Sequence, residues 1–211
     1  MNSEKFLCRL QGGCLIIGPL LFAASTFFWR PNGTYSAATG TLLVLALVFW
    51  TYGLIGVLDT LRRQQPVYAS VVQLVLVYGA IGGAAFGVRG FYDELFSFSR
   101  EQSVQALTTF GVRADLVFYW PGPLFPLSLL AIGIGLARAR VAPLWTSIMV
   151  CAVGVLFPLS RVPRVSWAAH LVDGLIVVAF AYLGYLRFHM KPSRKTRSGD
   201  ALPVAVRDRR E

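Results

Sequence analysis

Charged residues are scarce in this chain. Asp, Glu, Lys and Arg make up 14% of its 211 residues and apolar residues make up 55%, whereas a typical soluble domain has about 25% charged and 45–50% apolar residues. The apolar residues are gathered into blocks of about twenty, which is the length that a helix needs to cross the hydrocarbon core of a bilayer. This composition excludes a separate soluble domain and predicts an integral membrane protein.

The residues that build metal sites and covalent active sites are also few. The three cysteines, Cys8, Cys14 and Cys151, have no metal-ligand spacing. The two histidines, His170 and His189, are 19 residues apart in one apolar stretch, and a helix would separate them by nearly the thickness of a membrane. The chain also lacks the HExxH, GxSxG and P-loop motifs. We therefore expect no metal, no cofactor and no assignable catalytic residue.

The apolar blocks predict six transmembrane helices and hence an all-α, polytopic membrane bundle. Short breaks of turn or charged composition separate them. The first block continues beyond a run of small residues that resembles the cleavage end of a signal peptide, so we expect an uncleaved helix. Together the blocks form a single membrane domain, residues 1–190. Their approximate bounds are 11–29, 38–58, 67–88, 116–137, 141–160 and 166–188.

Two segments of useful length lie outside these spans. In the loop 89–115, Phe91, Leu95 and Phe98 follow a helical spacing, which predicts one or two short helices lying on the outer membrane surface. Residues 191–211 are polar and basic and include two prolines. Their composition predicts a disordered cytoplasmic tail that contacts anionic lipid headgroups.

The formal net charge of +10 indicates how the chain is oriented across the membrane. No nucleic-acid recognition motif accompanies the charge, and the cytoplasmic loops of membrane proteins collect Lys and Arg. With both termini inside, 14 basic residues lie inside and 6 outside, and the tail with its five basic residues between 187 and 197 decides the count. We therefore expect both termini to be cytoplasmic and no nucleic-acid partner.

The last span carries two ionisable residues, His170 and Asp173, in an otherwise apolar run. Asp173 would lie roughly 10 Å below the outer end of the helix, at about 1.5 Å per residue. An ionised aspartate facing lipid there would cost about 2.5–3.5 kcal/mol. Its face, which it shares broadly with Trp167 and His170, must therefore look into the bundle or a wet cavity and find a partner.

Several further residues are expected near the same level and could converge with His170, Asp173 and Trp167 on one outer-leaflet pocket. Two interpretations stay open. Asp173 could form a structural ion pair with an arginine while His170 bonds a backbone carbonyl, or the group could form a site for a ligand or a proton. The additional candidates are Arg161, Arg164, Arg89, Asp115, Tyr119 and Trp120.

Three stretches carry a resemblance to known proteins: GPLLFAASTFFWRP (18–31), PGPLFPLSLLAIGIGLARARVAPLW (121–145) and GVLFPLSRVPRVSWAAHLVDGLIVVAFAYLGY (154–185). In these stretches the chain resembles a broad group of small bacterial six-helix membrane proteins that carry a domain of unknown function. The likeness covers roughly residues 11–188 and includes no catalytic motif. It implies six helices and a location in the bacterial inner membrane.

Three functional hypotheses follow. The first is a non-enzymatic multi-pass membrane protein that binds or helps to move a small ligand, or associates with other membrane components, through the pocket around His170 and Asp173. The second is a membrane enzyme that acts on a lipid or isoprenoid substrate with His170 and Asp173 as an acid–base pair. The third is an interaction or sensory module that uses the basic tail.

Overall fold

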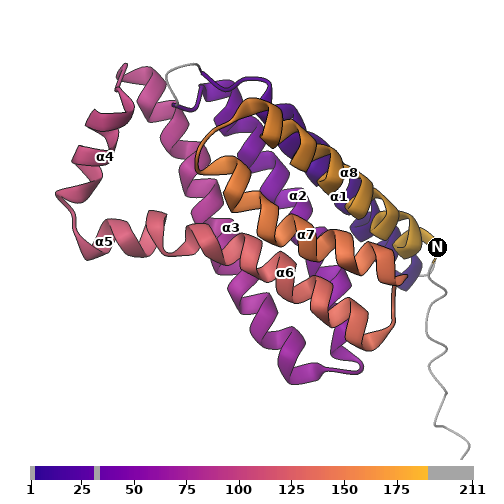
Figure 1. Cartoon of the computed structure of the whole chain (residues 1–211). Coiled ribbons are helices and arrows are strands. Elements are labelled where there is room, and N and C mark those ends of the chain that lie inside the picture. Colours follow the sequence, from indigo (N-terminus) through magenta and orange to yellow (C-terminus); the bar gives the residue numbers. More distant parts are fainter. Residues whose placement is uncertain (1–2, 31–33, 190–211) are drawn as a thin grey trace, which may run out of the picture.

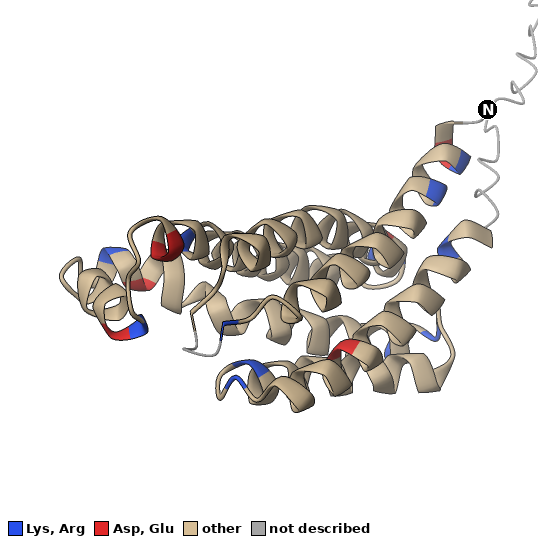
Figure 2. Cartoon of the chain, turned by 90° about the horizontal axis from the view of Figure 1, so that it is seen from above, with Lys and Arg blue, Asp and Glu red and all other residues tan. Residues whose placement is uncertain are grey.

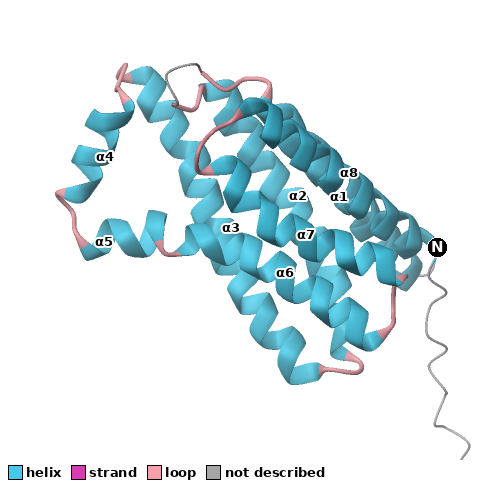
Figure 3. Cartoon of the chain, viewed as in Figure 1, coloured by secondary structure: helices cyan, strands magenta, loops and turns pink. Residues whose placement is uncertain are grey.

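The chain folds into a bundle of helices (Figures 1 and 3). A computed structural model describes residues 3–30 and 34–189, and this part of the chain contains no β-strand. The elements are α1 (Ser3–Thr26), α2 (Ala37–Arg62), α3 (Pro66–Leu95), α4 (Arg100–Thr108), α5 (Val112–Ala114), the π-helical turn η1 (Asp115–Tyr119), α6 (Pro121–Ala139), α7 (Leu144–Arg161) and α8 (Ser166–His189).

Six helices in the described residues are long and apolar enough to cross a membrane. They are α1, α2, α3, the continuous run Val112–Ala139, α7 and α8. The predicted all-α, six-span membrane bundle is thereby confirmed. Most helix ends lie within a few residues of their predicted positions. Where a helix is longer than predicted, as at the start of α1 and the end of α3, polar residues continue it beyond the apolar block.

Local chemistry sets several helix ends. The side chain of Ser36 caps α2 by accepting a hydrogen bond from the backbone N–H of Thr39 at 3.1 Å. Pro66 occupies the first turn of α3, where its missing N–H leaves no intrahelical bond unmade. At the C-terminal end of α6, Arg140 adopts a left-handed conformation with φ of 51° and terminates the helix.

The six long helices form a closed ring. Each packs against its neighbour in the order α1, α2, α3, α6, α7 and α8, and α8 returns to pack on α1 (Figure 1). Trp50 of α2 lies at the centre and is fully buried. Its ring meets Phe22, Phe125 and Phe180 edge-on at centroid distances of 5.4, 5.3 and 4.9 Å, so one aromatic cluster joins α1, α2, α6 and α8.

The outer flanks of the bundle are apolar. Large side chains such as Val48, Leu74, Ile81 and Leu171 are exposed on them, as expected of a surface that faces lipid. Charged residues lie mostly toward the ends of the helices, with long uncharged stretches between them (Figure 2). The chain is a multi-pass membrane protein.

The outer loop differs from its prediction in detail. α3 continues to Leu95, so Phe91 and Leu95 belong to its last turns, and α4 is the separate short helix. A capping box between Ser99 and Gln102 begins α4. α4 and α5 form an arm that turns back after the end of α3 and projects sideways from the bundle (Figure 1). The other predicted segment, the tail 191–211, lies outside the described residues.

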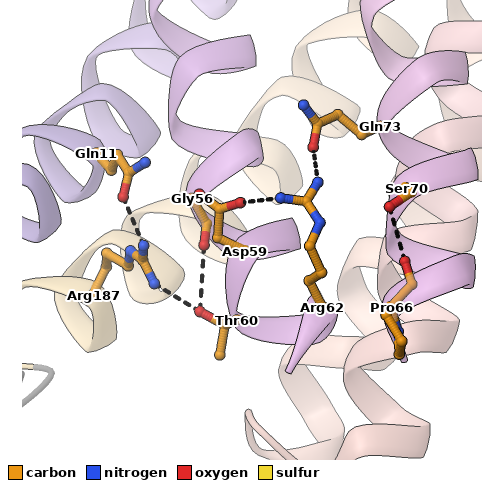
Figure 4. Close-up of polar contacts among 9 residues, drawn as sticks. All are labelled: Gln11, Gly56, Asp59, Thr60, Arg62, Pro66, Ser70, Gln73 and Arg187. Carbon is orange, nitrogen blue, oxygen red and sulfur yellow. Dashed lines mark hydrogen bonds and ion pairs between the residues drawn. The ribbon is translucent and has the colours of Figure 1, made fainter. Parts of the chain in front are cut away.

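A buried arginine holds together the opposite end of the bundle, near the start of α1. Arg187 of α8 donates to Thr60 Oγ1 of α2 at 2.7 Å and to Gln11 Oε1 of α1 at 2.6 Å (Figure 4). Beside it, Arg62 pairs with Asp59 at 2.8 Å and reaches Gln73 of α3. These side chains link α8, α1, α2 and α3 at one level.

Close approach of α6 and α7 depends on two glycines. A Cβ added at Gly133 would lie 2.6 Å from Cys151 Sγ and 2.8 Å from its backbone nitrogen. A Cβ at Gly154 would lie 2.6 Å from the backbone nitrogen of Leu130. Small residues of this kind let membrane helices gain packing contacts with each other.

We expect Gly133→Ala to destabilise the protein by about 1–3 kcal/mol, because the added methyl group forces α7 away from α6. Thermal unfolding in detergent measures the change. Gly174→Ala is the matched control, since a Cβ there meets nothing within 4 Å, and it should leave the unfolding temperature unchanged or slightly raised. Equal unfolding temperatures for the two variants would contradict this packing role.

Candidate functional site

A buried ion pair joins three helices near the end of the bundle that carries α4. Asp173 of α8 pairs through Oδ1 with Arg161, the last residue of α7. Its other oxygen accepts a hydrogen bond from Thr26 Oγ1 of α1 at 2.7 Å, and Arg161 donates to the same hydroxyl at 2.8 Å. The side chains of Asp173 and Arg161 are only 4% and 9% exposed. The expected ion pair between Asp173 and an arginine before the last span is therefore present.

Aromatic rings surround the guanidinium of Arg161. Its Cζ lies 4.5 Å from the ring centroid of Phe22, 5.0 Å from that of Trp29 and 5.7 Å from that of Phe157. Ring faces attract cations at these distances. Arg161 is thus held by a carboxylate and a hydroxyl on one side and by aromatic faces from α1, α7 and the turn after α1 on the other.

His170 sits at the margin of this cluster. Its Nδ1 is 4.0 Å from Asp173 Oδ2, and its side chain is 37% exposed. The imidazole packs on the ring of Phe27 with a centroid distance of 4.4 Å. It lines neither of the two cavities described below.

A cavity of about 430 Å³ opens beside Arg161, inside the ring of helices. On α2 it is lined by Thr39, Leu43 and Leu47, which occupy successive turns and span about 12 Å of helix. Its lining includes the exposed residues Arg100 and Val162, so the cavity reaches the surface at the α4 end. The deeper walls are aliphatic or aromatic and include Leu43, Leu47, Phe86, Phe118, Phe125 and Phe157.

A smaller cavity of about 140 Å³ adjoins the first, and the two share five lining residues: Tyr35, Phe86, Arg100, Tyr119 and Arg164. Its remaining walls are more polar and include Arg89 and Asp93. The pair of cavities therefore has an apolar interior and a cationic mouth.

A hydrogen-bonded network shapes the mouth from the side of the arm. Arg89 of α3 donates to Ser103 Oγ of α4 at 2.7 Å and lies 3.5 Å from Asp93 Oδ2. Ser103 in turn donates to Asp93 Oδ1 at 2.6 Å. The network fixes α4 to α3 and so places Arg100, the first residue of α4, at the mouth.

Arg164 enters the mouth from the turn between α7 and α8. Its backbone is left-handed, with φ of 56°, and its Cζ lies 4.2 Å from the ring centroid of Tyr35. Burial lowers the pKa of the Arg164 guanidinium from its ordinary value, and the positive charges of Arg100 and Arg89 lower it further. Tyr35 and Asp93 act on this pKa in the opposite direction, so burial is the main reason that the charge of Arg164 is disfavoured here.

The structure brings together most of the residues singled out in the sequence. Arg161, Arg164, Arg89 and Tyr119 line one or both cavities, Asp173 supports Arg161 from behind, and His170 lies at the edge. Asp115, Trp120 and Trp167 line neither cavity. Trp120 and Trp167 are 58% and 70% exposed, and the backbone carbonyl of Asp115 accepts the Trp120 N–H at 2.8 Å within the π-helical turn.

Other residues of the site carry no pattern that sequence analysis could detect. Thr26 is the last residue of α1 and looks like an ordinary small polar residue until α1 is placed beside α8. Tyr35 lies just before α2, and Arg100 is the first residue of α4. The only hint in the sequence was their predicted depth, because all three lie toward the predicted outer side of the membrane.

Comparison with protein-family models, with curated proteins and with solved structures gave no match. The resemblance to small bacterial six-helix membrane proteins therefore stays a prediction.

We expect Asp173→Leu and Arg161→Leu each to destabilise the protein by about 3–5 kcal/mol, because each leaves a buried group without its partner. The double variant Asp173→Leu/Arg161→Leu should cost less than the sum of the single changes. Unfolding in detergent, followed by temperature or by added denaturant, measures the three values.

The control for this cycle is Asp59→Ala, which removes a half-exposed ion pair and should cost only about 0.2–1 kcal/mol. Strictly additive effects of the two buried changes would show that the pair has no energetic coupling.

Proposed function

We propose that this membrane protein binds a small, largely apolar molecule in the cavity of about 430 Å³. The observation that carries the proposal is the cavity itself, enclosed by five of the six long helices and walled by aliphatic and aromatic side chains. Its volume falls in the range of about 300–1,000 Å³ that is typical of ligand sites. Polar groups gather at the mouth, where they can orient a ligand.

Binding fits this geometry better than acid–base catalysis. Among the described residues, the lining of the larger cavity contains no histidine, cysteine, aspartate or glutamate. Its serine and threonine hydroxyls are already engaged, since Ser25 donates to the Phe22 carbonyl at 2.6 Å and Thr39 to that of Phe28 at 2.8 Å. A general base must come within hydrogen-bond reach of the group that it deprotonates, and His170 packs on Phe27 outside the cavity.

The hypothesis of a basic interaction tail concerns residues outside the described part of the chain, and it stays a prediction.

We further propose that the protein resides in a bacterial inner membrane with both termini in the cytoplasm, so that the cavity opens in the outer leaflet. The support is the excess of Lys and Arg at the end of the bundle that carries the termini and the resemblance stated above. The cavity would then be reached from the outer leaflet or from the extracytoplasmic space.

Reporter fusions test this orientation. An alkaline phosphatase fused after His189 should be inactive and a green fluorescent protein at the same point should fluoresce, because the first needs export and the second folds in the cytoplasm. The opposite fusion results would invert the assignment and place the cavity in the inner leaflet.

We expect Gly122→Phe to lower the affinity for an apolar ligand at least about tenfold. Gly122 lines the cavity, and a Cβ there meets only the edge of Phe86 at 4.0 Å, so a phenyl ring can enter the empty space. Saturation binding of radiolabelled decanol to the full chain in phosphatidylcholine nanodiscs, with empty nanodiscs as background, measures the affinity.

The matched control is Gly174→Phe, which adds the same ring on the exposed side of α8 where a Cβ has open space. It should bind decanol like the unaltered protein. If the two variants bind decanol equally well, the cavity is not the binding site.

A further inference from the structure

The charge at the mouth of the cavities is strongly unbalanced. In the part of the chain that the structure describes, one carboxylate, that of Asp93, lines the two cavities, against the four arginines Arg89, Arg100, Arg161 and Arg164. Asp173 offsets the charge of Arg161 from behind. Counting Asp173 with these lining residues leaves two positive charges in excess, and Glu101, which follows Arg100 on α4 and lines neither cavity, is a further carboxylate close to Arg100. This excess is concentrated where an apolar cavity meets a polar one.

The arginines divide into two pairs by the cavities that they line, since Arg161 lines only the larger cavity and Arg89 only the smaller one. Arg161 is held by Asp173 and Thr26, and Arg89 by Asp93 and Ser103. Arg100 and Arg164 are the two that line both cavities. Arg164 lies against the ring of Tyr35, and Arg100 occupies the exposed first turn of α4. These two guanidinium groups stand at the boundary between the apolar interior and the polar vestibule.

An anion between these arginines would relieve two unfavourable conditions at once. The half-buried Arg164 has lost much of its hydration, and Arg100 and Arg89 repel it. Guanidinium groups bind carboxylates and phosphates through paired hydrogen bonds, and such charge-assisted bonds are the strong ones. The deeper walls of the apolar cavity offer a charged group few partners to replace its hydration, but they suit a hydrocarbon chain.

We propose that the ligand is an amphiphile with an anionic head, a phosphate or a carboxylate, which Arg100 and Arg164 hold at the smaller cavity while its apolar chain fills the larger one. This inference rests on the proposed function, because it assumes that the larger cavity binds a ligand. It adds the chemical class of that ligand and the residues that select it. Arg161 contributes to the wall but not to the selection, since Asp173 already neutralises it.

The test compares probes with one chain and different heads. Radiolabelled decyl phosphate, decanoate and decanol are bound to the full chain in phosphatidylcholine nanodiscs, and inorganic phosphate is offered as a competitor. We expect decyl phosphate and decanoate to bind at least about tenfold more tightly than decanol, and millimolar inorganic phosphate to displace them only weakly. In Arg100→Gln/Arg164→Gln the ratio of decyl phosphate to decanol affinity should fall below about two.

Two further variants separate selection from misfolding. Arg113→Gln removes an exposed arginine of the same arm that lines neither cavity, and it should keep the full preference for an anionic head. Arg164→Lys keeps the charge without the planar fork and should retain part of the preference. Each variant is used only after its unfolding temperature matches that of the unaltered protein.

The outcomes distinguish this inference from the proposed function. Equal affinities for decanol and decyl phosphate would overturn the anionic-head inference and leave the apolar site standing. Inorganic phosphate that binds as tightly as decyl phosphate would mean that the mouth takes a free anion and not an amphiphile. No binding of any chain-bearing probe above empty nanodiscs would overturn the proposed function itself.

Discussion

A buried carboxylate in a membrane helix needs a partner, and the rest of this structure is organised around the way in which Asp173 finds one. Its pairing with Arg161 and Thr26 brings α8, α7 and α1 together at one level. Leaving any one member of the group unpaired would bury an uncompensated polar group. The pair therefore aligns the last two spans with the first and closes the ring of helices on the side opposite α3.

The same ion pair also defines one wall of the cavity. Because Asp173 pairs with Arg161, the guanidinium is held among Phe22, Trp29 and Phe157 and forms an aromatic-lined end to an apolar space. The structural and the ligand-site interpretations of Asp173 are thus not exclusive. Asp173 does not line the cavity, and its role there is to position Arg161.

The two ends of the bundle use buried arginines in different ways. Near the termini, Arg187 meets neutral oxygens of Gln11 and Thr60 and serves to join helices (Figure 4). At the α4 end, four arginines line cavities that hold space for another molecule. The arm of α4 and α5 makes the difference, because it carries Arg100 to the mouth and is fastened to α3 by Arg89, Ser103 and Asp93.

The amino-acid sequence by itself determined the class of the protein, the six spans and the need of Asp173 for a partner, because bilayer thickness and the cost of a buried charge act on each segment separately. Only the tertiary structure decided that Thr26, Tyr35 and Arg100 belong to the site and that Trp120 and Trp167 do not. The cavity walls come from helices that are distant in the chain, and which face each helix turns inward depends on the packing of all six. No periodicity within one segment contains that information.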